Sequence, residues 1–202
     1  LCRQLKDSRV GVIQNELGKI NIDGTILRND DVRMVEISRG SIFCTCLMQN
    51  FIDTLAEMSK ENFDYLFVES SGWGDPSNVH EFIEEAKQIS GIEYDFGGVI
   101  CFVDALNFPE QVRDLKTAQR QLKHCNIAVI TKVDLADDSA VEHVRELIRE
   151  INPVCEILTS AMADLDYSFL RKDITIYQWS EAEASTNSSK NKPKTLFLEY
   201  QG

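Results

Sequence analysis

Hydrophobic and polar positions along this chain follow a repeating order of short apolar runs and longer amphipathic segments. The short runs predict buried strands, because the strands of parallel sheets read as nearly continuous hydrophobic stretches. The longer segments repeat apolar residues three or four positions apart, which is one face of an α-helix. The runs that predict strands are 9–13, 32–37, 65–68, 97–103, 127–130 and 154–158. The predicted helices are 47–58, 79–89, 109–122 and 141–151.

This alternation of strands and helices predicts an α/β fold with a mostly parallel sheet and helices on both faces. Open sheets of this kind bind ligands beyond the carboxyl ends of their strands. Polar residues follow the predicted strands again and again, so the candidate chemistry should gather at one rim of the sheet. These polar positions are 14–18, 69–72, 104, 131–134 and 159–161.

Length and composition indicate a globular chain of 202 residues, 43% of them hydrophobic. We place a nucleotide-binding domain at 1–170, a polar linker at 171–194 and the start of a further domain at 195–202. The net charge of −12 argues against binding to nucleic acid or to anionic membranes. No apolar run approaches the roughly 20 residues of a membrane span, and no signal peptide opens the chain.

The cysteines are scattered rather than paired in a framework. Three of them lie in or beside predicted strands, where a free thiol behaves as a small apolar group. This usage is typical of the reducing cytoplasm and predicts a cytoplasmic protein. The six positions are Cys2, Cys44, Cys46, Cys101, Cys125 and Cys155.

The run Tyr65–Val68 ends abruptly on an acid, Glu69, and a flexible loop through Gly72 follows it. A carboxylate at the end of a buried parallel strand can hold Mg²⁺ directly or through water, as the Walker B acid does in P-loop NTPases. The amide of Gly72 can donate to a terminal phosphate. A second interpretation stays open, in which Glu69 is a polar strand end that faces water.

The segment Thr131–Asp134 has a logic of its own. A carboxylate after a strand can accept both N–H donors on the edge of guanine, whereas adenine presents no such pair, so Asp134 would select GTP. The stem of Lys132 can cover the base, and Ser160 with Ala161 can touch it through backbone groups. The alternative is a lysine and an aspartate that begin an ordinary surface loop.

Taken in order, these motifs resemble the CobW family of metal-handling GTPases, relatives of the hydrogenase and urease maturation GTPases. The resemblance extends from Val10 to about Leu165. It rests on VIQNELGKINIDGTIL, the turn 40–46, VESSGWGDPSNV, FVDALNF and AQRQLKHCNIAVITKVDL. They correspond to the family's V-I-x-N-E-F-G-x-x-x-I-D-G, G-C-I-C-C, E-T-S-G-x-A-D-P, V-D-A-x-x-F and N-K-x-D-L patterns.

Several departures from the family pattern bear on function. The chain contains no G-x-x-x-x-G-K-[ST] motif, and we expect the family's P-loop to precede Leu1. Ser41 and Phe43 stand where the family has cysteines, while Cys44 keeps the last cysteine position and Cys46 is additional. Lys19 replaces an acid, and Thr131 replaces the asparagine before the base-reading lysine.

The resemblance implies a protein that binds and hydrolyses GTP with Mg²⁺ and delivers a metal, or activates a metalloprotein client. Glu69 and Gly72 would act in catalysis, and the loops that begin at Thr131 and Ser160 would bind the nucleotide. A homodimer is a further possible partner arrangement. The alternative is a module that lacks a P-loop, does not hydrolyse GTP and binds a metal or a client.

Metal binding is the other implied property. Thiolates favour Zn²⁺ and other soft or borderline transition metals. Cys44 and Cys46 supply two ligands at most, so Glu16 and Asp23 are the further candidates. The alternative is that both cysteines are ordinary reduced thiols that bind no metal. All four candidates follow neighbouring predicted strands, so we expect nucleotide state to change metal affinity.

Overall fold

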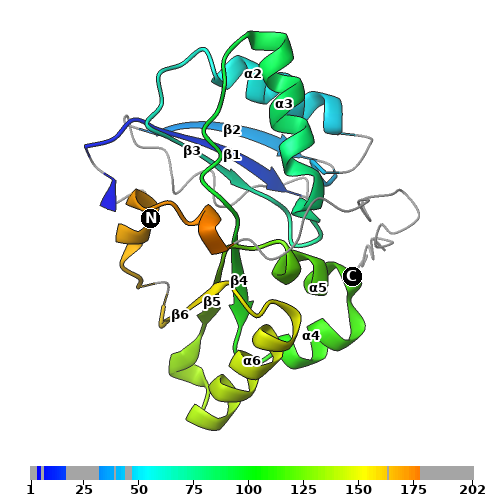
Figure 1. The fold of residues 1–202 in the computed structure, drawn as a ribbon, viewed down its shortest axis with the longest axis vertical. Helices are drawn as coiled ribbons and strands as arrows, with labels where there is room; N and C mark the ends of the chain where they lie inside the picture. Colours follow the sequence, from blue (N-terminus) through cyan, green and yellow to red (C-terminus); the bar gives the residue numbers. More distant parts are fainter. Residues whose placement is uncertain are drawn as a thin grey trace, which may run out of the picture.

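The computed structural model describes residues 4–5, 7–16, 32–38, 40–43, 47–162 and 164–177. In this part of the chain the strands form two parallel three-stranded sheets, which lie one above the other in Figure 1. The N-terminal sheet has the order β2-β1-β3 and the C-terminal sheet the order β4-β5-β6. The strands are β1 (Val10–Glu16), β2 (Val32–Ser38), β3 (Tyr65–Glu69), β4 (Ile100–Asp104), β5 (Ile127–Thr131) and β6 (Glu156–Ser160).

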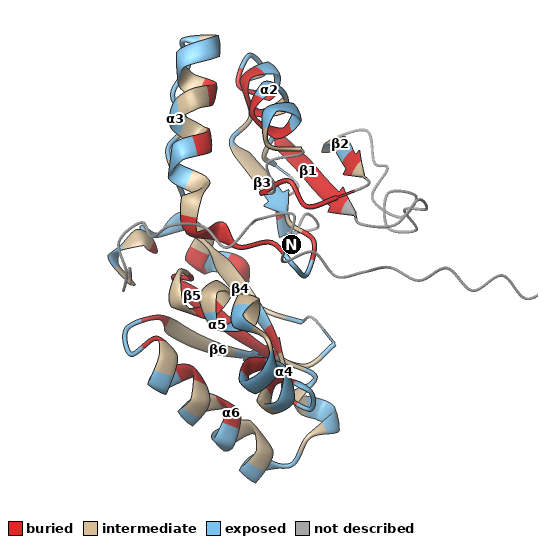
Figure 2. Ribbon diagram, turned by 90° about the vertical axis from the view of Figure 1, so that its right-hand side faces the viewer, coloured by how far each residue is buried: buried red, intermediate tan, exposed pale blue. Residues whose placement is uncertain are grey.

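The N-terminal sheet packs one face against helices α2 (Met48–Met58) and α3 (Val79–Ser90). Apolar residues recur along one side of each helix and meet Ile13 and Ile37 of the sheet. Figure 2 shows this division, with buried residues along β1 and exposed residues on the outer side of α3. The helical contribution to this core is Phe51, Ile52, Leu55, Ala56, Met58, Phe82 and Ala86.

The C-terminal sheet is built around β5, in which Ile127–Ile130 are completely buried. One face carries α4 (Phe108–Asp114), α5 (Lys116–Lys123) and α6 (Asp138–Ile151). The other face carries two short 3₁₀ helices, η4 (Tyr167–Arg171) and η5 (Thr175–Tyr177). A strand covered on both faces explains why β5 is apolar without interruption.

The predicted α/β class with parallel strands is confirmed, but the strands form two sheets rather than one continuous sheet. Among the described strands, β3 is an edge of the N-terminal sheet and β4 an edge of the C-terminal sheet. These two strands do not pair with each other, so the two sheets stay separate. Residues 171–177 fall in the predicted linker, yet Ile174 packs into the core of the C-terminal sheet. The remainder of that linker and residues 195–202 lie outside the described residues.

Three local predictions differ from the structure. The helix predicted at 109–122 is two helices, because Leu115 is extended (φ −116°, ψ 107°) and ends α4. The side chain of Gln119 stabilises this break by donating to the carbonyl of Val112 at 2.7 Å. The strand predicted at 97–103 begins at Ile100. The strand predicted at 154–158 is β6, which begins at Glu156 and ends at Ser160. Before α3, the side chain of Asp75 caps the 3₁₀ turn η2 (Pro76–Asn78).

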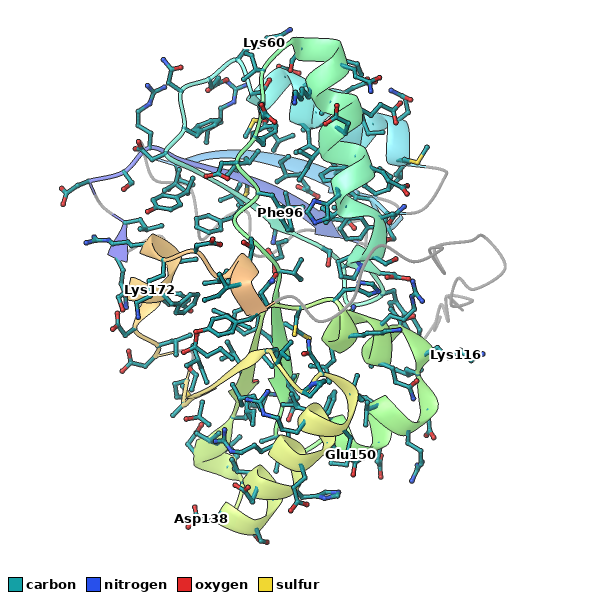
Figure 3. The ribbon with its side chains drawn as sticks, in the orientation of Figure 1. Lys60, Phe96, Lys116, Asp138, Glu150 and Lys172 are labelled. Carbon is teal, nitrogen blue, oxygen red and sulfur yellow. The ribbon has the colours of Figure 1, made fainter. Side chains whose placement is uncertain are left out.

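Several contacts between described residues join the two sheets. The side chain of Gln4 donates to the carbonyl of Leu165 at 2.9 Å, and Leu170 packs against Val10 and Val12 of the N-terminal sheet. The segment that follows α3 crosses between the sheets and contains Phe96, which is labelled in Figure 3. The rings of Phe96 and His80 meet edge-on, with 4.2 Å between their centroids. None of the described helices is both long and apolar enough to cross a membrane.

Candidate functional site

The strand register of the C-terminal sheet brings the carboxyl ends of its strands to one edge. Asp104 pairs with Thr131, and Thr131 pairs with Ser160. The hydroxyl of Thr131 donates to the carbonyl of Val103 at 3.1 Å, which holds the ends of β4 and β5 together. Residues predicted from three separate motifs therefore lie along one rim, where ligands of such sheets bind.

Lys132 is fixed at this rim by its backbone and by its side chain. Its dihedral angles (φ 59°, ψ 30°) are left-handed, an uncommon conformation for a residue with a Cβ atom. Its ammonium nitrogen lies 2.7 Å from Oδ2 of Asp104. A non-glycine residue in this conformation costs free energy, and such residues cluster at functional sites.

The carboxylate of Asp104 is oriented toward that lysine by hydrogen bonds from neighbouring residues. Its Oδ1 accepts from the amide of Leu106 at 2.9 Å, and its Oδ2 accepts from the side chain of Asn107 at 2.8 Å. Burial on its own would raise the pKa of Asp104, but the hydrogen bonds from Lys132, Asn107 and the two amides lower it to about 2. Asp104 therefore carries a full negative charge at neutral pH and holds the Lys132 ammonium in place.

The other predicted nucleotide residues lie on the loops beyond β5 and β6. Asp134 is exposed in the 3₁₀ turn η3 (Val133–Leu135), two residues after Lys132. Ser160 ends β6, and its hydroxyl donates to the carbonyl of Asp164 at 3.1 Å. Ala161 forms an antiparallel bridge with the same Asp164, which turns the loop back on itself. The arrangement leaves an exposed carboxylate two residues after a lysine that is held by an ion pair.

The loop that follows β3 contains the predicted catalytic residues. Glu69 is exposed at the end of β3 and pairs with Gln14 in the strand register, and Gly72 is exposed three residues later. The side chain of Gln121 on α5 donates to the carbonyl of Gly72 at 3.1 Å and to that of Gly74 at 2.8 Å. An accessible carboxylate at this place suits a hard cation such as Mg²⁺.

A buried ion pair fixes the same loop to α5. Oδ2 of Asp75 lies 2.6 Å from Nε of Arg120, and the two side chains are 0% and 15% exposed. Oδ1 of Asp75 also accepts from the amide of Ser77 at 3.0 Å. Helix α5, which precedes β5, therefore holds the loop that follows β3.

The candidate metal ligands are mostly outside the described residues. Glu16 is the last residue of β1, but its side chain is not described, and neither are Asp23, Cys44 and Cys46. Within the described ranges, no group of three or more His, Cys, Asp or Glu side chains could hold a metal ion. The metal site thus stays a prediction.

Two positions where the family pattern has cysteines are described, and both belong to the packing of the N-terminal sheet. Phe43 stacks on Phe82 at 6.0 Å between ring centroids and meets Phe51 edge-on at 5.9 Å. Ser41 is buried, and its hydroxyl makes no hydrogen bond with the described residues. Phe43 therefore packs between α2 and α3, and it offers no thiol that could bind a metal.

Sequence reasoning gave no role to several residues that organise this site. Asn15 lies within the stretch VIQNELG, in which the sequence indicates a functional role only for Glu16. Arg120 and Gln121 lie within AQRQLKHCN, and Asp104 lies within FVDALNF. All four fall inside family-like motifs, but the long-range contacts that give them roles span 22 to 56 positions of sequence.

Comparison with known proteins agrees with this geometry. A family model described as "CobW/HypB/UreG, nucleotide-binding domain" matches residues 1–159. The zinc chaperone YjiA of Escherichia coli is 27% identical over 167 residues, which cover 80% of this chain and 52% of YjiA. Zinc-regulated GTPase metalloprotein activator 1 of Dictyostelium discoideum is 24% identical over 193 residues, which cover 75% of this chain and 40% of that protein.

Solved structures show the same fold. A Zn(II)-bound triple mutant of YjiA, with alanine in place of one glutamate and two cysteines, superposes with a TM-score of 0.60 at 22% identity over 95% of this chain and 59% of that one. Nickel-bound HypB of Helicobacter pylori gives 0.53 at 19% identity over 80% and 70%. The chain spans about half the length of the curated relatives it matches or less. It belongs to the CobW/HypB/UreG family of nucleotide-binding domains.

Proposed function

We propose that this chain is the nucleotide-binding part of a GTPase that handles a transition metal, delivering it to or activating a metalloprotein client. The observation that carries the proposal is the fixed Lys132, held by Asp104 at 2.7 Å beside the exposed Asp134. A pre-positioned lysine stem and an accessible carboxylate match the face and the edge of guanine. The names of the relatives support the metal: two of them are described as a zinc chaperone and a zinc-regulated GTPase.

In this proposal the residues divide the work by position. Asp134 reads the guanine edge, Lys132 covers the base, and Thr131, Ser160 and Ala161 complete the base side. Glu69 holds Mg²⁺ directly or through water, and the Gly72 amide contacts the terminal phosphate. Mg²⁺ would supply charge neutralisation at the phosphates. The chain as printed carries no Walker A motif, so binding is tested on protein expressed from its complete gene.

The metal cargo is proposed for the thiols at Cys44 and Cys46 with Glu16 and Asp23. Two thiolates and carboxylates form a donor set that suits Zn²⁺. The register supports the grouping, because β1 and β2 are neighbours and Glu16 pairs with Ser38 at their carboxyl ends.

Competition binding with GTP, ATP and XTP tests the nucleotide. Asp134→Asn should weaken GTP by at least about tenfold, because an amide donor replaces one acceptor of a charged hydrogen-bond pair. XTP should instead bind more tightly, since the C2 carbonyl of xanthine can accept from the new amide donor but has no partner on a carboxylate. Asp138→Asn, an exposed carboxylate at the start of α6, is the matched control and should change nothing. Unaltered GTP preference in Asp134→Asn would remove Asp134 from the base site.

Hydrolysis tests the catalytic assignment. Glu69→Gln should slow GTP turnover by at least about tenfold, which corresponds to about 1.4 kcal/mol of barrier. Glu81→Gln, on the exposed side of α3, should turn over GTP normally. A protein that binds no GTP at all would instead support the second candidate, a non-hydrolysing module that binds a metal or a client.

A further inference from the structure

Asn15 is a buried side chain whose carboxamide is completely used. Its Nδ2 donates to the carbonyls of Ile37 at 2.9 Å and Gly40 at 2.6 Å. Its Oδ1 accepts from the amides of Ile42 at 3.1 Å and Ser71 at 3.3 Å. A carboxamide offers two donors and two acceptor lone pairs, so these four bonds exhaust it. Only 3% of the residue is exposed.

The partners of Asn15 belong to three different segments. Ile37 is in β2, Gly40 and Ile42 are in the turn that follows β2, and Ser71 is in the loop that follows β3. These partners are 22 to 56 positions away along the chain. One planar group thus fixes the distance between the turn that leads to Cys44 and the loop that contains Gly72.

A second contact joins the same two segments. A Cβ atom added to Gly74 would lie 2.9 Å from the ring of Phe43 and 2.8 Å from the hydroxyl of Ser70. The turn and the loop are therefore packed without space between them at this point. Any shift of the loop is passed to the turn by direct contact as well as through Asn15.

Each segment also carries an unused polar group. The hydroxyls of Ser41 and Ser71 are buried and make no hydrogen bond with the described residues. Buried polar groups are normally paired, so an unpaired one in each segment leaves capacity for a different pairing in another state. The bond to Ser71, at 3.3 Å, is the longest of the four that Asn15 makes.

We propose that Asn15 is the positioning residue that links nucleotide state to the turn at Gly40–Phe43, and through it to the thiols that follow. This inference rests on the proposed function, in which the Gly72 amide contacts the terminal phosphate. When that contact forms, the neighbouring Ser71 amide moves. Oδ1 of Asn15 then moves with it and shifts the Ile42 amide, while Nδ2 keeps the turn attached to β2. Metal affinity follows because Cys44 comes two residues after Ile42.

The test measures how much nucleotide state changes metal affinity, as the ratio of the Co²⁺ dissociation constants in two nucleotide states. The dissociation constant of Co²⁺ is measured in the protein expressed from its complete gene, with GDP and with a non-hydrolysable GTP analogue. The wild-type ratio should lie in the range of about 5- to 150-fold that is typical of coupled sites. Asn15→Asp keeps an acceptor toward Ile42 and Ser71 but turns a second oxygen toward two carbonyls. Its ratio should fall to about 1, with both ligands still bound.

Asn152 provides a matched control. It is also fully buried, and its carboxamide makes the same four kinds of bond, to the carbonyls of Leu122 and Cys125 and the amides of Val154 and Cys155. Asn152→Asp imposes the same chemical change at the opposite end of the C-terminal sheet. Any loss of stability should be similar, but the Co²⁺ ratio should stay at the wild-type value.

Hydrogen exchange of the Ile42 amide gives a second readout, which does not depend on metal binding. In wild-type protein its exchange rate should differ between the GDP and GTP-analogue states, and in Asn15→Asp the difference should vanish. Equal exchange in both wild-type states, or an unchanged Co²⁺ ratio in Asn15→Asp, would overturn the role of Asn15 and leave the proposed function standing. Failure of the wild type to bind GTP or Co²⁺ would overturn the proposed function, and the inference with it.

Discussion

The ammonium nitrogen of Lys132 lies 2.7 Å from Oδ2 of Asp104, a residue 28 positions earlier in the chain. The pair joins the end of β4 to the loop after β5. A free lysine side chain occupies many rotamers, and ordering it when a ligand arrives costs binding free energy. Because Asp104 orders Lys132 in advance, the stem that we propose to cover the base is held in place before any nucleotide binds.

Removing this pair should weaken nucleotide binding without unfolding the protein. In Asp104→Asn the amide can still accept from Leu106, but the ion pair to Lys132 is lost. We expect GTP affinity to fall by roughly three- to tenfold, about 1 kcal/mol, in a titration with a fluorescent guanine nucleotide. Asp114→Asn, which removes an exposed carboxylate from α4, should bind normally. Full affinity in Asp104→Asn would mean that the backbone of Lys132 is sufficient.

Asp104 should also make stability depend on pH in acid. Its pKa is lowered to about 2, below the value of about 3.9 in an unfolded chain. Between these values the unfolded state binds more protons, so Asp104 stabilises the fold above about pH 4 and this stabilisation is lost as the pH falls toward 2. Urea unfolding at pH 6 and at pH 3 should show a smaller loss of stability in Asp104→Asn than in wild type. Identical losses would contradict the assigned pKa.

The buried pair between Asp75 and Arg120 should matter far more for stability than a surface pair. Arg120→Met takes the guanidinium from a carboxylate that is 0% exposed, and breaking such a pair costs about 3–5 kcal/mol. Arg113→Met breaks a pair whose side chains are 70% and 61% exposed, and should change stability little. Chemical denaturation of both variants measures the difference. Equal costs would show that Asp75 is satisfied without Arg120.

Gly74 tests how closely the loop after β3 is packed. The Cβ atom of Gly74→Ala would meet Ser70 and Phe43 within 2.9 Å, so we expect a loss of about 1–3 kcal/mol in unfolding free energy. Nothing lies within 4 Å of the Cβ position at Gly97, so Gly97→Ala is the control and should change stability little. A neutral Gly74→Ala would mean that the turn at Phe43 yields easily.

The elements of this fold were predictable where periodicity was strong. The apolar runs at β3 and β5 and the helical spacing at α2 and α6 depend on local sequence, and all four elements are confirmed. The break at Leu115 was not predictable, because neither glycine nor proline marks it. It exists through a side-chain bond from Gln119 to a helix end, which depends on tertiary packing.

The candidate site divides in the same way. Asp134 and Glu69 could be proposed from sequence because each is a charged residue that follows an apolar run within a few positions. The role of Asn15 could not, because it depends on three segments that meet only in the folded chain. Phe43 stands at a position where family likeness suggests a cysteine, and only its contacts with Phe51 and Phe82 give it a packing role.

Those aromatic contacts determine how the turn at 40–43 can open. Phe43 comes from the turn, Phe51 from α2 and Phe82 from α3, and the three rings lie within 6.0 Å of one another by centroid. The turn cannot detach without exposing rings from both helices, so turn and helices form one cooperative unit of local unfolding. A short surface turn would normally exchange its amide hydrogens within seconds. Here the Phe43 amide should instead exchange as slowly as the interior of α2, and a displacement of the turn should carry both helices with it as a rigid body.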